Sequence, residues 1–410
     1  MSRHLAIAVL AAVSLPAGDW PQHLGPSRNG VSPEPVSWVA GGPAVVWKRE
    51  VGQGFASPAV AQGKLILFHR AGDKEVVECL DAATGKKLWS LEYPTAYRDD
   101  FGFDEGPRAT PTIAAGRVFT FGAEGMLHAI DLATGKKLWS IQTHQKFGVR
   151  KGFFGAAGAP LVEGDRVILN LGGSDAGIVA FDAQTGKTLW QATNDESGYS
   201  SGVAAILGGV RHALFFTRTG LTGLDPANGT VRFRFPWRAR MSASVNAASP
   251  LVAGDLVFVS ASYGTGAALL RVGDGSPKQL WSSDEVMSNH YATCVYQDGF
   301  LYGYHGRQEE GPSLRCVDLK TGKVRWNVDR FLAGTVTLAG GQLLLMREDG
   351  ELVLAPASPE AFKPTARARV LPATVRAYPA LAGGKLYVRN EKTLVCLDVH
   401  ARPAPAAGRQ

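Results

Sequence analysis

The sequence predicts an all-β fold, an eight-bladed β-propeller built from four-stranded antiparallel blades. The main observation is a repeated phrase, Asp-x-x-Thr-Gly-Lys-x-Leu-Trp, with weaker copies in which some positions differ. The copies begin at Asp81, Asp131, Asp182, Asp225 and Asp318. Their spacings are 50, 51, 43 and 93 residues, and the last interval holds one degenerate copy around 274–281. A period of roughly 40 to 50 residues with several short strands per unit is typical of a β-propeller.

Each repeat contains four strand patterns in a constant order. A short segment after a proline opens it, as at Pro58, Pro111, Pro160 and Pro250. A Gly-x-Leu/Val strand follows, then an apolar strand that ends at the Asp, and last a strand that carries the Trp. These stretches are rich in β-branched and aromatic residues and are separated by Gly and Asx turn signals, which is the pattern of consecutive antiparallel strands.

The repeated phrase itself has a structural explanation. The Asp carboxylate can accept backbone N–H groups across the turn, and the Gly supplies the positive-φ residue of a bulged hairpin. The Trp that follows is large enough to cover the apolar area between neighbouring blades. We therefore expect these Asp residues to be structural and not catalytic.

The strand openings predict eight blades that close into a ring. The blades begin near residues 55, 108, 157, 201, 247, 291, 334 and 377. The last blade has no Trp-bearing strand after Asp398, and the segment from Val45 to Arg49 resembles that missing strand. We predict that it completes the last blade and removes both free sheet edges. The propeller then spans 43–400, with 19–42 as an arm across one face and 401–410 as a flexible tail.

The first 18 residues have the features of a secretory signal peptide. A polar start with Arg3 precedes an apolar run of nine residues, Leu5 to Val13, and small residues end at Gly18 before Asp19. A buried N-terminal helix is the alternative. We predict export to the periplasm or the medium. The run is too short to span a bilayer and no later stretch qualifies, so no transmembrane span is expected.

We expect a monomer, and the distribution of charge favours a solvated surface. The chain has 43 Lys and Arg against 36 Asp and Glu, a net charge of +7. Such an excess can attract nucleic acid or anionic surfaces. We interpret the basic residues as scattered through the turns, however, without a basic block and without an alternation of basic and aromatic residues on one element. No nucleic-acid partner is predicted.

The four cysteines are expected to be free thiols. Cys79, Cys316 and Cys396 each stand two residues before a repeat Asp, so they occupy equivalent places in different blades. Equivalent places in different blades are too far apart for a disulfide. Cys294 is the fourth, and without a Cys-x-x-Cys-His motif no c-type haem is attached.

The repeated phrase resembles the tryptophan-docking repeat of pyrroloquinoline quinone (PQQ)-type β-propellers. That family includes PQQ-dependent alcohol dehydrogenases and the lipoprotein of the outer-membrane β-barrel assembly machinery. The segment from Asp19 to Gly30 also resembles exported bacterial PQQ-like repeat proteins. The resemblance covers nearly the whole mature chain. It implies the propeller fold and leaves the activity open, because the repeat is the part that builds the scaffold.

Two departures from the dehydrogenases bear on the cofactor. The resemblance implies a disulfide between adjacent cysteines under the quinone, and this chain has no Cys-Cys pair. It also implies a Ca²⁺ site and a catalytic Asp in long inserted loops, for which 410 residues leave little room. No cofactor is therefore firmly predicted, and PQQ with Ca²⁺ stays open as the alternative. No lipidation Cys follows the signal segment, which weakens the likeness to the assembly lipoprotein.

The candidate ligand site lies at the mouth of the central channel, where the segments that enter each innermost strand converge. Arg108 could clamp a carboxylate or phosphate in a bidentate manner, and His290 could act as a base or a ligand. The full candidate set is Arg108, Tyr199, Asn246, His290 and Tyr291. The alternative is that these residues hydrogen-bond the backbones of neighbouring blades around a water-filled channel. No catalytic residue is assigned.

Two further segments are interpreted as surface. The loop from Tyr93 to Pro107 is acidic, but its residues lack the spacing of an EF-hand loop, so no metal is predicted. The run from Arg307 to Pro312 is expected in an exposed hairpin.

We expect an exported propeller that serves as a non-catalytic scaffold for a small ligand or an unknown envelope protein. The alternative is a PQQ-dependent oxidoreductase of alcohols or sugars, in which Arg108 polarises a quinone oxygen. The third hypothesis is a role in outer-membrane protein assembly.

Overall fold

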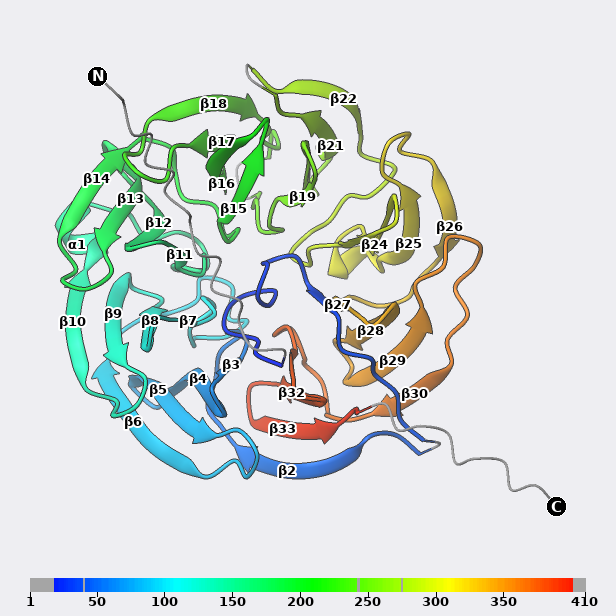
Figure 1. Cartoon of the computed structure of the whole chain (residues 1–410), viewed down its shortest axis with the longest axis horizontal. Helices are drawn as coiled ribbons and strands as arrows, with labels where there is room; N and C mark the ends of the chain where they lie inside the picture. Colours follow the sequence, from blue (N-terminus) through cyan, green and yellow to red (C-terminus); the bar gives the residue numbers. More distant parts are fainter. Residues whose placement is uncertain (1–17, 40, 242–243, 274–275, 401–410) are drawn as a thin grey trace, which may run out of the picture.

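The computed structural model is an eight-bladed β-propeller, seen down its axis in Figure 1. It describes residues 18–39, 41–241, 244–273 and 276–400. The predicted signal peptide apart from Gly18, the predicted tail and Asp274 of the degenerate repeat lie outside the described residues. Within the described part, the only helices are the short α1 (Thr143–Phe147) and the 3₁₀ turn η1 (Gln308–Glu310). The prediction of an all-β, eight-bladed fold is confirmed.

Blades 1 to 4 follow one another along the chain, and in each the strands pair antiparallel from the channel outward. Blade 1 holds β3 (Ala59–Ala61), β4 (Lys64–Ala71), β5 (Lys74–Asp81) and β6 (Lys87–Pro94). Blade 2 holds β7 (Thr112–Ala114), β8 (Arg117–Phe121), β9 (Met126–Asp131) and β10 (Lys137–Gln142). Blade 3 holds β11 (Leu161–Glu163), β12 (Arg166–Gly173), β13 (Ala176–Asp182) and β14 (Thr188–Ala192). Blade 4 holds β15 (Val203–Leu207), β16 (Val210–Thr217), β17 (Gly220–Leu224) and β18 (Val231–Pro236).

Blades 5 to 8 continue the same order. Blade 5 holds β19 (Leu251–Ala253), β20 (Leu256–Ala261), β21 (Gly266–Arg271) and β22 (Lys278–Ser283). Blade 6 holds β23 (Val295–Gln297), β24 (Phe300–His305), β25 (Ser313–Asp318) and β26 (Val324–Val328). Blade 7 holds β27 (Gly334–Ala339), β28 (Gln342–Arg347), β29 (Glu351–Pro356) and β30 (Ala366–Arg369). Blade 8 takes β31 (Ala380–Ala382), β32 (Lys385–Arg389) and β33 (Thr393–Asp398) from the end of the chain.

The ring is closed by β2 (Ala44–Glu50), which supplies the outer strand of blade 8. It pairs antiparallel with β33, from Ala44 opposite Asp398 to Glu50 opposite Thr393. This confirms the predicted closing strand, which extends one residue further at each end than the sequence indicated. In Figure 1 the blue and red ends of the chain meet in this blade.

Blade 7 contains a fifth strand that the sequence did not predict. β1 (Val31–Ser32) pairs parallel with β27, the innermost strand of that blade. A strand of two residues is too short to produce a recognisable alternation of apolar and polar residues, so the pattern could not reveal it.

Neighbouring blades are joined through the repeat tryptophans, as expected. Each indole Nε1 donates a hydrogen bond to a carbonyl at the turn of the next blade: Trp47 to Ala82 (3.0 Å), Trp89 to Leu132 (3.1 Å), Trp139 to Ala183 (3.2 Å), Trp190 to Pro226 (3.2 Å), Trp281 to Leu319 (2.8 Å) and Trp326 to Ser358 (2.8 Å). The indole rings of the first five of these Trp residues also pack on the glycine of that turn. A Cβ on Gly135 would lie 2.6 Å from Trp89, so the residue must be Gly for steric as well as conformational reasons.

The repeat Asp residues hold the turns, which confirms their structural role. Asp81 Oδ1 accepts hydrogen bonds from the backbone N (2.8 Å) and Oγ1 (2.7 Å) of Thr84. Asp131, Asp182 and Asp318 make the same pair of bonds to the Thr three residues on. These bonds stabilise the ionised carboxylate and lower the pKa of Asp81 below its ordinary value.

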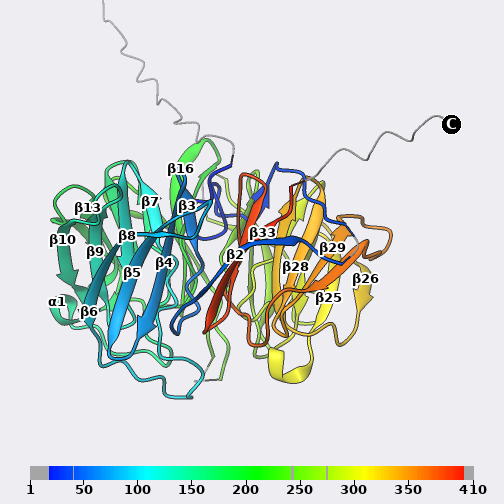
Figure 2. The same ribbon diagram turned by 90° about the horizontal axis from the view of Figure 1, so that it is seen from below.

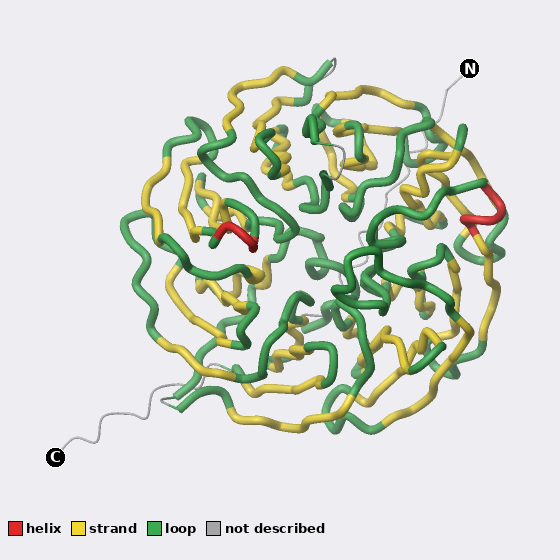
Figure 3. Tube along the Cα trace, turned by 180° about the vertical axis from the view of Figure 1, so that it is seen from behind, coloured by secondary structure: helices red, strands yellow, loops and turns green. Residues whose placement is uncertain are grey.

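The connections divide between two faces of the disc. The Asp-Gly turns and the hairpins between the first two strands lie on one face, which we call the turn face. The loops that enter each first strand, and those between the second and third strands, lie on the other, which we call the mouth face. Figure 2 shows the disc from its edge and Figure 3 shows it from behind. All four cysteines are buried and free, as predicted. No helix among the described residues is long and apolar enough to cross a membrane.

Candidate functional site

The first part of the predicted arm, residues 19–30, enters from the turn face and lies at the centre of the ring. Trp20 is 1% exposed and exchanges two backbone hydrogen bonds with Val60 in β3. Arg28 is buried in the channel, where its guanidinium donates to the Gly202 carbonyl (2.9 Å), to Thr112 Oγ1 (3.3 Å) and to the Pro160 carbonyl. One side chain thus joins blades 2, 3 and 4. Burial lowers the pKa of Arg28 to about 9, so it still carries its charge at neutral pH.

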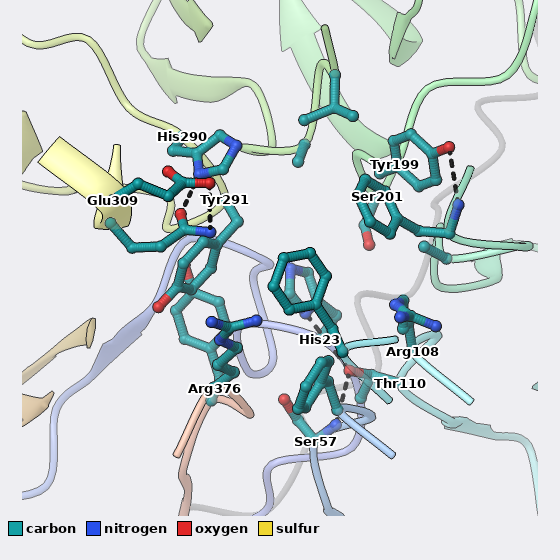
Figure 4. A pocket seen from close by; sticks show the side chains of 18 of the residues that line it. His23, Ser57, Arg108, Thr110, Tyr199, Ser201, His290, Tyr291, Glu309 and Arg376 are labelled. Carbon is teal, nitrogen blue, oxygen red and sulfur yellow. Dashed lines mark hydrogen bonds between the residues drawn. The ribbon is translucent and has the colours of Figure 1, made fainter. Parts of the chain in front are cut away.

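On the mouth face, the channel opens into a pocket of about 210 Å³. Figure 4 shows its side chains converging from loops of most blades. The walls are aromatic, with two guanidiniums, two imidazoles, one carboxylate, one amide and several hydroxyls among them. The lining residues are His23, Phe55, Ser57, Phe103, Arg108, Thr110, Phe154, Ala157, Tyr199, Ser201, Val245, Ala247, Tyr263, His290, Tyr291, Gln308, Glu309, Arg376 and Tyr378.

The floor of the pocket belongs to the arm. His23 lies 3.5 Å from Thr110 Oγ1 through Nδ1, and its ring stacks edge-on against Tyr378 at 5.4 Å. Burial, aided by the charge of Arg28, lowers the pKa of His23 to about 3. The imidazole is therefore neutral at the base of the channel, and nothing in the sequence around His23 indicated that it would reach the pocket.

The structure brings four of the five candidate residues together. Arg108, Tyr199, His290 and Tyr291 line the pocket, whereas Asn246 does not belong to the lining. Asn246 is buried, and its amide donates to the backbone carbonyls of Thr217 (2.8 Å) and Trp237 (3.1 Å). Asn246, in the segment that enters blade 5, thus bonds the backbone of the neighbouring blade 4, which is the alternative that the sequence left open for the whole set.

Arg108 is already engaged by its own loop. Its Nη2 forms an ion pair with the fully buried carboxylate of Asp99 and donates to the Asp104 carbonyl at 3.0 Å. The guanidinium also lies 5.6 Å from the centre of the Phe55 ring, a cation–π contact. The positive charge of Arg108, which we expected to bind an anionic ligand, is therefore largely neutralised by Asp99.

A second arginine, not predicted from the sequence, faces the pocket from the entry to blade 8. Arg376 Nε donates to Glu348 Oε1 at 2.8 Å, and its guanidinium lies 5.5 Å from the centre of Phe55. Glu348 Oε1 also accepts the hydroxyl of Tyr291 at 2.8 Å. Arg108 and Arg376 thus flank one aromatic ring. In Figure 4 they lie on opposite sides of the pocket.

His290 has a defined protonation state. Its Nε2 lies 2.7 Å from the Tyr263 hydroxyl, and its Nδ1 contacts the amide oxygen of Gln308. Because that oxygen only accepts, Nδ1 carries the proton and Nε2 accepts from the tyrosine. Burial lowers the pKa of His290, which keeps the ring neutral. Both nitrogens are therefore used within the protein.

The hairpin that includes η1 is exposed at Glu309, Glu310 and Gly311, as expected for the run from Arg307 to Pro312. In addition, Gln308 and Glu309 line the pocket, which was not expected. Glu309 pairs with Arg307 at 3.4 Å. This position was not predicted, because the loop joins a second strand to a third and only loops that enter first strands were expected at the channel mouth.

The acidic loop before blade 2 uses its carboxylates for internal contacts. Asp99 pairs with Arg108 and Asp100 with Lys151. Asp104 accepts the backbone N–H groups of Gly54 (3.0 Å) and Gly106 (2.7 Å). Across the described ranges, no group of three or more His, Cys, Asp or Glu side chains could hold a metal ion.

Residues 73–328 match the protein family described as outer membrane protein assembly factor BamB. The chain belongs to this family of PQQ-like β-propellers. The predicted resemblance is therefore confirmed. No curated protein sequence is a significant match to the chain.

Solved structures of similar fold have different described functions. BamB from Moraxella catarrhalis is 15% identical with a TM-score of 0.64, and the alignment covers 87% of this chain and 99% of that one. Quinohemoprotein alcohol dehydrogenase from Comamonas testosteroni is 16% identical with a TM-score of 0.67, covering 96% and 82%. The computationally designed Ika8 protein is 12% identical with a TM-score of 0.60, covering 87% and 100%. At these identities the likeness establishes the fold alone.

Proposed function

We propose that this protein is an exported, non-catalytic propeller that binds a flat anionic organic ligand in the mouth-face pocket. The observation that carries the proposal is the pairing of every charged side chain in the lining. Arg108 pairs with Asp99, Arg376 with Glu348, and Glu309 with Arg307. Both nitrogens of His290 are engaged as well, and burial lowers the pKa of His23 to about 3, so the pocket offers walls and hydrogen bonds but no ready general base.

The ligand class follows from the lining. Aromatic rings such as Phe55, Phe103 and Phe154 favour a flat apolar surface between them. Arg376 is the better anion-binding group of the two, because it donates to Glu348 only through Nε, whereas Arg108 Nη2 makes two bonds inside its own loop. A planar ring that carries a carboxylate could stack on the aromatic walls and take the remaining donors of Arg376.

The residues do not fit the Ca²⁺-assisted quinone site that the family resemblance implies. The described residues contain no cluster of three metal-ligating side chains, and the sequence has no adjacent cysteines. The carboxylates nearest the pocket, Asp99, Glu309 and Glu348, each pair with an arginine. A PQQ-dependent dehydrogenase is the second candidate function and is favoured by the fold, and outer-membrane protein assembly is the third.

Export belongs to the same proposal. It rests on the apolar segment from Leu5 to Val13, which lies outside the described residues, and on membership in a family described by an outer-membrane assembly factor. An envelope protein as an additional partner is compatible with this reading.

The test is calorimetric titration of the purified protein with PQQ and with quinoline-2,4-dicarboxylate, each with and without Ca²⁺. We expect binding that Ca²⁺ does not change, and no dye reduction when alcohols or sugars are added. Arg376→Gln should weaken binding about tenfold or more, because one charged hydrogen bond is lost. Arg369→Gln, on the outer strand β30, is the matched control.

Two outcomes would contradict the proposal. Binding that requires Ca²⁺ and leads to dye reduction would make the protein a dehydrogenase. Absence of binding to either probe would remove the pocket as a site for flat anions and leave a protein partner as the function to pursue.

A further inference from the structure

A second pocket on the mouth face lies outside the central channel, and we call it the side pocket. It is built mainly by the two longest connections between blades, residues 95–111 and residues 143–160, the second of which includes α1. Both connections depart from the repeat, and binding residues concentrate in such loops on a regular scaffold. The volume of the side pocket is about 480 Å³. Its polar lining consists of Arg98, Glu124, Gln142, His144, Gln145 and Lys151.

Tyr97 separates the side pocket from the mouth-face pocket. Its hydroxyl lies 3.4 Å from Nη1 of Arg108, which lines the mouth-face pocket. Lys151 Nζ, on the side-pocket side, lies 5.4 Å from the centre of the Tyr97 ring. Tyr97 is only 2% exposed, so its ring offers almost no surface to a ligand. The side pocket therefore differs from the mouth-face pocket, whose walls are aromatic.

The carboxylate and the amides of the side pocket keep hydrogen-bonding capacity. Among the described residues, Glu124 is bonded through Oε2 alone, which accepts Thr95 Oγ1 (2.7 Å) and the Ala96 backbone N–H (2.9 Å). Glu124 Oε1 thus remains as an acceptor. Gln142 Oε1 accepts a backbone N–H at 3.1 Å, and no described residue bonds its amide NH₂ or the side chain of Gln145.

The imidazole of His144 adds one donor and one acceptor to this lining. Its ring packs edge-on against Phe121, with the ring centres 6.2 Å apart. Burial lowers the pKa of His144 to about 4, so the ring is neutral at physiological pH. A neutral imidazole donates through one nitrogen and accepts through the other.

The positive charges of the side pocket are compensated by its own loops. Arg98 Nη1 pairs with Glu105 at 3.0 Å, and Lys151 pairs with Asp100. Together with Glu124, the pocket and its partners thus hold two positive and three negative groups. A ligand with a strong charge of either sign gains little from such a balanced set. The remaining N–H groups of Arg98 and Lys151 can still donate hydrogen bonds.

This combination of groups favours a ligand rich in hydroxyls. A hydroxyl donates and accepts through a single atom, so it suits a wall on which donors and acceptors alternate. The apolar part of the lining is Ala96, Ala123 and Val149, small side chains that can contact the C–H groups of a sugar ring. The volume lies within the range of pockets that hold small molecules.

We infer that the side pocket binds a neutral saccharide of two linked rings, whose hydroxyls bond Glu124, Gln142 and Gln145. This second site does not depend on the ligand proposed for the mouth-face pocket, because it shares no lining residue with it.

Titrations followed by saturation-transfer NMR test this inference, with maltose, cellobiose and N,N′-diacetylchitobiose as probes. We expect at least one disaccharide to bind with a dissociation constant of about 1 mM. Gln145→Ala should weaken that binding about three- to tenfold, because the hydrogen bonds of one neutral amide are lost. Gln145→Trp should abolish it, because the indole occupies the pocket. Gln145 is exposed, so thermal unfolding should be unchanged in both variants.

The matched control is Gln184→Trp, the same change at an exposed residue of the turn face, which should leave sugar binding unchanged. Absence of binding for all three disaccharides would overturn the inference. Binding that survives Gln145→Trp would place the sugar elsewhere on the protein and would also overturn it. Tighter binding of glycylglycine than of any disaccharide would contradict the inference as well, and would make the side pocket a site for zwitterions.

Discussion

An indole ring lies on a turn glycine at five blade junctions of the described residues, those of Gly85, Gly135, Gly186, Gly229 and Gly322. Trp139 of blade 2 covers Gly186 of blade 3, where a Cβ would lie 2.8 Å from the ring. Its Nε1 also donates to the Ala183 carbonyl. Two constraints therefore require a glycine at this position. The indole of Trp139 leaves no room for a Cβ, and the turn requires the positive φ of +74° that Gly186 adopts.

A double-mutant cycle measures this pairing. Trp139→Ala should lower the free energy of unfolding by about 3 kcal/mol, since much apolar area is lost between two blades. Gly186→Ala should cost about 2 kcal/mol through the clash and the strained φ. In the double variant, Gly186→Ala should lower the free energy of unfolding by less than it does alone, because the indole with which its Cβ clashes is absent. Urea unfolding of the four proteins gives the coupling.

The control for backbone strain alone is Gly116→Ala. Gly116 has a φ of +72° but no atom within 4 Å of its Cβ position. Additive effects of the two substitutions at residues 139 and 186 would show that the indole and the glycine are independent.

Single site residues could be predicted only where their position in the repeat was known. Arg108, Tyr199, His290 and Tyr291 precede first strands, and the repeat places all such segments around the channel. His23 could not be found, because the path of the arm depends on buried contacts such as those of Arg28. The commitment of Arg108 to Asp99 was equally hidden, since an ion pair depends on the fold of one irregular loop.

At the scale of elements, one strand holds the ring closed. β2 joins the first part of the chain to the last blade by pairing with β33, and its Trp47 docks on the turn of blade 1. Every other blade is covalently continuous from its second strand to its fourth. Blade 8 depends on pairing alone.

Trp47→Ala should therefore loosen the closure before the rest of the ring. We expect faster amide hydrogen exchange across Ala44–Glu50 and in β33, measured by mass spectrometry under native conditions. Trp139→Ala is the matched variant inside the ring and should leave exchange in β2 unchanged. If both variants instead accelerated amide hydrogen exchange equally in all blades, the closing blade would be no weaker than the other blades.

The elements themselves were predictable to the extent that they repeat. The segment that enters each first strand, the Asp-Gly turn and the Trp-bearing strand recur along the chain. Counting these repeats therefore predicted the blade boundaries and the closing strand near Val45. β1 and η1 occur once each, and their placement depends on the tertiary contacts of blades 6 and 7.

At the scale of the whole molecule, buried histidines govern stability in acid. Burial lowers the pKa of His23 and His69 to about 3, and those of His128 and His305 to about 4. In the unfolded chain each ring takes a proton near pH 6.5. The stability they contribute is therefore complete above about pH 6.5 and is lost as the pH falls toward the folded-state values.

Urea unfolding at pH 7 and pH 5 should show this loss. His23 alone should account for about 2 kcal/mol of the fall in the free energy of unfolding from pH 7 to pH 5. In His23→Gln this fall should therefore be smaller by that amount. The same substitution at exposed His400 is the control. An identical pH dependence in wild type and His23→Gln would mean that His23 accepts its proton within the folded protein.

The arm and the closing blade place both ends of the described chain on one face of the disc. Gly18 lies against the β31–β32 hairpin, with its Cβ position 3.3 Å from Gly383, and His400 bridges to Val36. Both ends of the described chain therefore leave from the turn face. A protein immobilised through either end on a sensor chip would present its pocket to the solution.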